Sequence, residues 1–161
     1  MAVLHFSHTG ICVSNLERST AFYRDVLGFK QHHTLHFEGG GTSTLLRIDD
    51  VVFDAVYLER DGTVIELLHF ADCVETRDAM PREVNKLGLT HISFNVEDMR
   101  GLLDAIEAGG GSILHQTRIG GELDGPIVCL FVTDPDGTLI ELVQSPADPT
   151  RLPLQPDDLE R

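Results

Sequence analysis

Two glutamates occupy the same place in a repeated segment of this sequence. Residues 61–68 recur as residues 136–143 with six of eight positions identical, and the copies contain Glu66 and Glu141 within apolar runs. Such a repeat indicates a duplicated supersecondary unit. An ionised carboxylate among apolar side chains costs several kcal/mol unless it is paired or binds a cation. Because this costly residue occurs twice, we expect it to have a chemical use.

Histidines open the two halves at matching positions. His8 lies in one expected strand and His91 in the equivalent strand of the other half. Two imidazoles and two carboxylates suit Zn, Ni, Co, Mn or Fe(II) and leave positions open for water or substrate. The sequence therefore predicts that one divalent metal ion is bound by His8, Glu66, His91 and Glu141. The competing interpretation is that each is a rim or surface residue, or that the duplicated site is vestigial.

Each half is predicted to contain a strand, a helix and three further strands. In the first half, Ser14 and Glu17 have the spacing of a capping box, and Gly28 should end the helix. The Asp61-Gly62 pair predicts a tight hairpin. The expected strands are residues 4–13, 31–37, 52–59 and 63–70, then 89–96, 113–118, 127–133 and 138–145, with a second helix over residues 99–106.

The domain organisation follows from this repeat. The first histidine and glutamate are 58 residues apart and the second pair 50, so the first half carries extra residues, which we place near Gly39–Gly41. The predicted divisions are a first βαβββ module at 4–70, a linker at 71–88, a second module at 89–145 and a proline-rich acidic tail at 146–161.

Composition excludes several classes of function. A net charge of −14 opposes binding to nucleic acid, whose affinity for proteins depends on Lys and Arg. The sequence contains neither an apolar run of about 20 residues nor a secretory signal, so no membrane role and a cytoplasmic location are expected. Three cysteines without CxxC spacing favour reduced thiols over disulfides or a cysteine zinc site.

Together these motifs resemble the vicinal oxygen chelate superfamily, which includes glyoxalase I, methylmalonyl-CoA epimerase, extradiol dioxygenases and the fosfomycin and bleomycin resistance proteins. The resemblance rests on His8–Ile11, Ala21–Phe29 and the closing Asp134–Leu142 segment. It implies an α+β fold in which two tandem βαβββ modules form a curled mixed sheet around a metal site. The superfamily's ligand positions fall on the four residues named above, a set similar to that of bacterial glyoxalase I.

The resemblance implies a divalent-metal-dependent lyase or isomerase of the glyoxalase I or epimerase type. Such an enzyme abstracts a proton next to a carbonyl of a small metal-chelated substrate, with Glu141 and Glu66 as candidate bases. His36 and His115 either line the pocket or lie on its rim. A homodimer is expected because a short curled sheet leaves open edges. Whether the ligands come from one chain or two stays open.

Two alternatives belong to other classes. An Fe(II)-dependent dioxygenase of the extradiol type would use only His8, His91 and Glu141, so Glu66 argues for isomerase or lyase chemistry. A metal-free small-molecule-binding resistance protein would need none of the four ligands. Methylmalonyl-CoA epimerases usually have Gln at the position of Glu66, which weighs mildly against that activity.

Overall fold

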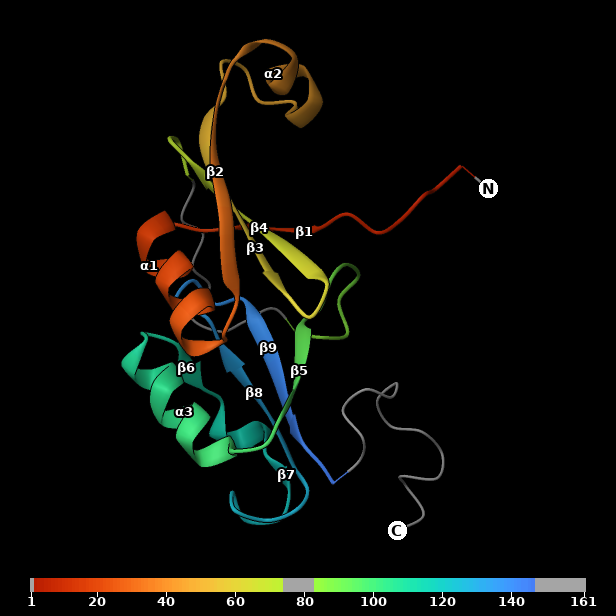
Figure 1. The fold of residues 1–161 in the computed structure, drawn as a ribbon, viewed down its shortest axis with the longest axis vertical. Helices are drawn as coiled ribbons and strands as arrows, with labels where there is room; N and C mark the ends of the chain where they lie inside the picture. Colours follow the sequence, from red (N-terminus) through yellow and green to blue (C-terminus); the bar gives the residue numbers. More distant parts are fainter. Residues whose placement is uncertain (1, 74–82, 147–161) are drawn as a thin grey trace.

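The computed structural model describes residues 2–73 and 83–146. Half of the expected linker and nearly all of the expected tail lie outside these residues. The chain forms two mixed sheets, one from each half, with helices α1 and α3 on one side of them (Figure 1). The α+β class and the two-module organisation of the sheets agree with the expectation from the sequence.

The first sheet has the strand order β1-β4-β3-β2, in which β1 runs parallel to β4 and the other neighbours are antiparallel. The chain turns between β3 and β4 at Asp61 and Gly62, both with positive φ, as the tight hairpin requires. The first-half elements are β1 (Thr9–Cys12), α1 (Leu16–Ala21), the π-helical turn η1 (Phe22–Val26), β2 (Lys30–Glu38), α2 (Gly40–Leu46), β3 (Val52–Arg60) and β4 (Thr63–Phe70).

The second sheet repeats this plan with the order β5-β9-β8-β6, while the short β7 also pairs with β8. Its parallel pair is β5 with β9, which corresponds to β1 with β4. The second-half elements are β5 (Ile92–Val96), α3 (Met99–Ala108), β6 (Ser112–Ile113), the 3-10 turn η2 (His115–Thr117), β7 (Ile119–Gly120), β8 (Val128–Thr133) and β9 (Leu139–Gln144).

Three local expectations need correction. The α1 N-cap is Asn15, whose side chain accepts a hydrogen bond from the Arg18 amide, whereas Ser14 binds Asp136 in the second half. The strand expected over residues 4–13 spans only Thr9–Cys12, so His8 lies just before it. Helix α2 (Gly40–Leu46) lies where the extra residues of the first half were expected. The single strand expected over residues 113–118 is interrupted by η2, because Thr117 turns back to bond the Leu114 carbonyl.

One hydrophobic core joins the two halves. The inner face of α1 and η1 meets the inner face of α3, and both pack on apolar residues of the two sheets. Phe22, Tyr23 and Ile106 are at most 1% exposed. Asp136 of the β8–β9 turn extends this contact, because its carboxylate accepts hydrogen bonds from Ser14 and Arg18 near the start of α1.

None of the helices in the described ranges is long and apolar enough to cross a membrane.

On the side of β1 away from the core, residues 2–8 extend from the body of the molecule (Figure 1). Val3, Leu4 and Phe6 in this N-terminal arm are 74–92% exposed.

Candidate functional site

The first candidate pair lies at the edge of the first sheet. His8 immediately precedes β1, and Glu66 is in the middle of β4, opposite Gly10 in the parallel register. The His8 Nε2 atom is 3.1 Å from Glu66 Oε2. The Ser7 hydroxyl contacts the other ring nitrogen, Nδ1, at 3.0 Å. This second contact orients the ring so that Nε2 faces the carboxylate.

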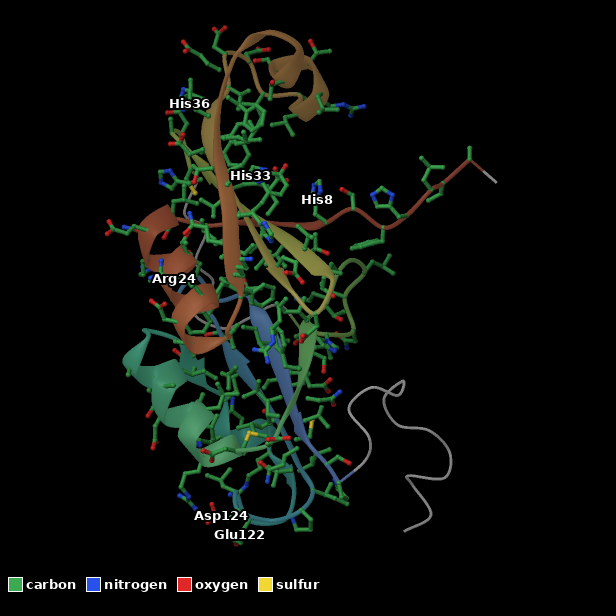
Figure 2. All side chains as sticks on the ribbon, viewed as in Figure 1. His8, Arg24, His33, His36, Glu122 and Asp124 are labelled. Carbon is green, nitrogen blue, oxygen red and sulfur yellow. The ribbon has the colours of Figure 1, made fainter. Side chains whose placement is uncertain are left out.

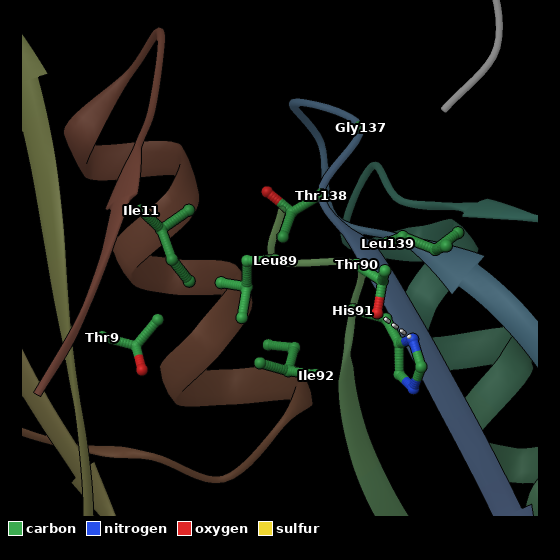
Figure 3. A pocket seen from close by; sticks show the side chains of 9 residues that line it. All are labelled: Thr9, Ile11, Leu89, Thr90, His91, Ile92, Gly137, Thr138 and Leu139. Carbon is green, nitrogen blue, oxygen red and sulfur yellow. Dashed lines mark hydrogen bonds between the residues drawn. The ribbon is translucent and has the colours of Figure 1, made fainter. Parts of the chain in front are cut away.

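The second pair repeats the arrangement on the second sheet. His91 precedes β5, and its Nε2 atom is 3.7 Å from Oε2 of Glu141 on β9. The Thr90 hydroxyl contacts His91 Nδ1 at 3.0 Å (Figure 3). Ser7 and Thr90 therefore have the same role in the two halves, since each hydroxyl contacts Nδ1 of the histidine that follows it. A hydroxyl on Nδ1 that accepts the ring proton leaves Nε2 with a free lone pair, which is the form that binds a metal.

The two carboxylates have different neighbours. Glu66 accepts a hydrogen bond from the Tyr57 hydroxyl on β3, whereas Glu141 accepts one from Ser93 at 2.7 Å and a weaker one from the Cys129 thiol at 3.7 Å. The position that corresponds to Tyr57 is Phe131, which lies opposite Glu141 in the register. The two half-sites thus share a backbone plan and differ in their donors.

Burial and the nearby carboxylates shift two pKa values. Burial, followed by the hydrogen bond to Glu66 and its charge, raises the pKa of Tyr57 to about 12. Burial and the charge of Glu141 raise the pKa of the Cys129 thiol to about 11. Both groups therefore keep their protons at neutral pH and act as hydrogen-bond donors to the carboxylates.

The spacing of each pair fits part of the coordination shell of a divalent ion. Two ligand atoms with metal bonds of about 2.1 Å are about 3.0 Å apart at a right angle and about 3.4 Å apart at the tetrahedral angle. The observed separations of 3.1 Å and 3.7 Å lie close to these values. Imidazole nitrogen and carboxylate oxygen are also the ligand types that Zn, Ni, Co, Mn and Fe(II) accept.

Within one chain the structure brings together His8 with Glu66 and His91 with Glu141, but it does not bring all four together. Among residues 2–73 and 83–146, no three His, Cys, Asp or Glu side chains are grouped so that they could hold a metal ion. The pairs lie on separate sheets. Each chain consequently presents two half-sites with two potential ligands each.

The other histidines named from the sequence lie away from the pairs. His36 is toward the α2 end of β2 (Figure 2), where its Nδ1 atom is 2.7 Å from Asp54. His115 is in η2, outside the β5 and β9 strands that carry the second pair. By contrast His33, which sequence reasoning did not single out, stacks on Tyr57 with ring centroids 4.7 Å apart.

A cavity of about 200 Å³ lies behind the second pair, at the junction of the two halves (Figure 3). Its lining includes Ile11 of β1, Ile92 of β5 and His91. Neither Glu66 nor Glu141 lines it. The cavity is smaller than the roughly 300–1,000 Å³ typical of ligand sites, so the open faces that carry the two pairs are better candidates for substrate binding.

Comparison with known proteins assigns the chain to a family. Residues 5–142 match the model of the Glyoxalase/Bleomycin resistance protein/Dioxygenase superfamily, and the chain belongs to this superfamily. Among curated relatives, lactoylglutathione lyase of Neisseria meningitidis serogroup A is 34% identical over 138 residues, which cover 85% of this chain and 88% of that protein. These relatives support a glyoxalase-type enzyme.

A second relative and a solved structure agree with this assignment. A probable lactoylglutathione lyase of Synechocystis is 31% identical over 140 residues, covering 86% of this chain and 93% of that protein. A glyoxalase family protein from Bacillus cereus superposes with a TM-score of 0.73 at 19% identity, covering 89% of this chain and 97% of that one. The structural match shows that the fold is shared.

Proposed function

We propose that this chain is a divalent-metal-dependent lyase of the glyoxalase I type, with His8, Glu66, His91 and Glu141 as metal ligands. The observation that carries the proposal is the pair of equivalent His–Glu contacts, at 3.1 Å and 3.7 Å, one in each module. The names of the curated relatives favour an adduct of glutathione with a small ketoaldehyde as substrate. Glu66 is the ligand that favours this chemistry over that of an oxygenase.

We further propose that the complete site forms between two chains of a homodimer. Each chain carries two separate half-sites, so one pair from each of two chains would supply four ligands. The exposed apolar arm, with Phe6 74% exposed, and the edge strands β1 and β5 offer the surfaces that such a dimer would cover. A two-fold axis would then create two equivalent sites.

The residues of the site suit a proton transfer between neighbouring carbon atoms. In the hemithioacetal, a carboxylate of Glu141 or Glu66 removes the proton from the carbon that bears sulfur and hydroxyl. The same proton returns to the adjacent carbonyl carbon, while the hydroxyl proton of the first carbon is lost and a proton is added to the former carbonyl oxygen, so the product thioester is an isomer of the substrate. A divalent ion held by the four ligands supplies Lewis-acid stabilisation of the negative charge that develops on the substrate oxygens.

Elemental analysis tests the proposal directly. Full-length protein purified without chelator should contain about one Ni, Co, Zn, Mn or Fe per chain and isomerise the hemithioacetal of methylglyoxal and glutathione. Glu66→Gln and Glu141→Gln should each lower the metal content and reduce kcat at least 100-fold, because each removes a charged ligand. His36→Gln, on the same sheet as Glu66 but away from both pairs, is the control. Wild-type protein without metal, and without activity after metals are added, would rule the proposal out.

A further inference from the structure

We infer that Tyr57 is a positioning residue that fixes the Glu66 carboxylate as a metal ligand; this rests on the proposed function. The hydroxyl of Tyr57 donates a hydrogen bond to Glu66 Oε1. The other oxygen, Oε2, faces His8 Nε2 at 3.1 Å. Oε1 of Glu66 thus accepts the hydrogen bond from the phenol, and Oε2 remains available to bind the metal.

This division restricts how the carboxylate can move. If Glu66 rotated to bind the ion through both oxygens, or swung away from it, the hydrogen bond to Tyr57 would break. A hydrogen bond to an ionised acceptor is among the stronger ones in proteins. Glu66 side-chain exposure is only 12%, so water cannot readily replace the phenol as donor. Tyr57 therefore selects a single-oxygen contact to the ion.

The ring of Tyr57 is itself held in place by aromatic neighbours. His33 stacks on it with ring centroids 4.7 Å apart and an interplanar angle of 20°. His8 meets its edge at 5.6 Å and 85°. His33, Tyr57 and Glu66 are direct neighbours on β2, β3 and β4, and Figure 2 shows His33 and His8 beside this part of the sheet. Packing from two sides orients the hydroxyl before any ligand arrives.

The second module shows that the ring and the hydroxyl have separate roles. Phe131 lies opposite Glu141 and packs on His91 with ring centroids 5.3 Å apart at 73°, just as Tyr57 packs on His8. The aromatic ring is thus present in both half-sites, but the phenolic hydroxyl is present only beside Glu66. A phenylalanine is compatible with the fold at this position, so Tyr57→Phe should remove the donor and leave the packing intact.

The test compares two tyrosine variants. The chain contains two tyrosines, and Tyr23 donates to Asp134 at 3.0 Å in the core, away from both half-sites. Tyr57→Phe and Tyr23→Phe therefore make the same chemical change in different places. Full-length wild type and both variants are freed of metal with a chelator, and Ni²⁺ binding is measured by calorimetry well below each thermal midpoint. We expect Tyr57→Phe to weaken binding about 10- to 100-fold and Tyr23→Phe to change it less than twofold.

A double-mutant comparison shows whether Tyr57 acts through Glu66. In a Glu66→Ala background the added Tyr57→Phe change should alter Ni²⁺ affinity less than twofold, because the acceptor of the Tyr57 hydrogen bond is gone. Equal Ni²⁺ affinity for wild type and Tyr57→Phe, or an equal loss in both backgrounds, would overturn the inference while leaving the proposed function intact. Wild-type protein that binds none of Ni²⁺, Co²⁺, Zn²⁺, Mn²⁺ and Fe²⁺ would overturn the proposed function and this inference together.

Discussion

The two glutamates at the centre of the site are equivalent by sequence and different by environment. Each glutamate faces an imidazole, but Glu66 also has a phenol beside it, whereas Glu141 has a serine hydroxyl and a thiol. A thiol is a weaker donor than a phenol. The charge on Glu141 is therefore balanced by smaller and more adaptable groups than the charge on Glu66.

At the scale of single residues, the thiol of Cys129 provides a prediction. Because burial and the Glu141 charge raise the pKa of its thiol to about 11, little thiolate is present at neutral pH, and only the thiolate reacts with alkylating agents. In chelator-treated protein, Cys129 should react with iodoacetamide at pH 7.5 on the order of 100-fold more slowly than free glutathione. The rate should rise about tenfold per pH unit until the thiol titrates. Mass spectrometry of the peptide that contains Cys129 measures its alkylation rate. Alkylation as fast as that of glutathione would contradict the prediction.

Whether these residues could be predicted depends on whether the sequence reveals how their strands are paired. The four ligand candidates stand out because the octapeptide repeats. Tyr57 could have been found too, since a two-residue turn at Asp61-Gly62 pairs positions symmetrically and places residue 57 opposite residue 66. His33 could not, because its pairing with Tyr57 spans the α2 segment and follows a register shift after Gln31.

At the scale of elements, the contact between α1 and the β8–β9 turn joins the two modules. Asp136 in that turn accepts hydrogen bonds from the Ser14 amide at 3.1 Å and the Ser19 hydroxyl at 3.1 Å, and it pairs with Arg18. Burial alone opposes ionisation of this carboxyl, but the hydrogen bonds from Ser14 and Arg18 outweigh it and lower its pKa. The charged form therefore stabilises the folded state.

Asp136→Asn should consequently destabilise the protein in a pH-dependent way. A carboxyl with a lowered pKa contributes stability above its unfolded pKa of about 3.9 and loses it as pH falls through the folded value. We expect a loss of about 2 kcal/mol in the free energy of unfolding at pH 7, with the gap to wild type closing as the pH falls below about 4. Urea titrations of both proteins at several pH values measure this difference in the free energy of unfolding. A constant gap across this range would show that the charge of Asp136 is not responsible.

The elements themselves were largely predictable, but the cap of α1 depends on a contact that is distant in sequence. Strands, helices and the Asp61-Gly62 turn follow from apolar periodicity and turn chemistry. The α1 cap moved from Ser14 to Asn15 because Asp136, distant in sequence, binds the serine. A contact between residues 122 positions apart has no local signal, so only the assembled modules reveal it.

At the scale of the whole molecule, a site shared between chains can be distinguished from one within a chain by complementation. Glu66→Gln and Glu141→Gln homodimers should each be nearly inactive. After the two proteins are mixed, unfolded and refolded together, random pairing makes about half of the dimers mixed, and each mixed dimer has one site with both glutamates intact. About a quarter of wild-type activity should return.

The same mixture separates the alternatives. If all four ligands came from one chain, every chain would still carry one substitution, and no activity would return on mixing. Refolded wild-type protein sets the attainable recovery, and either variant refolded alone sets the background. Size-exclusion chromatography with light scattering should give the mass of a dimer for all three samples.

The core shared by the two modules has a consequence for how such a chain arose. Its buried residues come from both halves, including Phe22 and Leu67 of the first and Ile106 and Leu142 of the second. An ancestral protein with a single module would have exposed its helix face to water and would have needed a second copy to cover it. Tandem fusion turned that concentration-dependent association into a permanent one, after which the two copies of each residue were free to diverge independently.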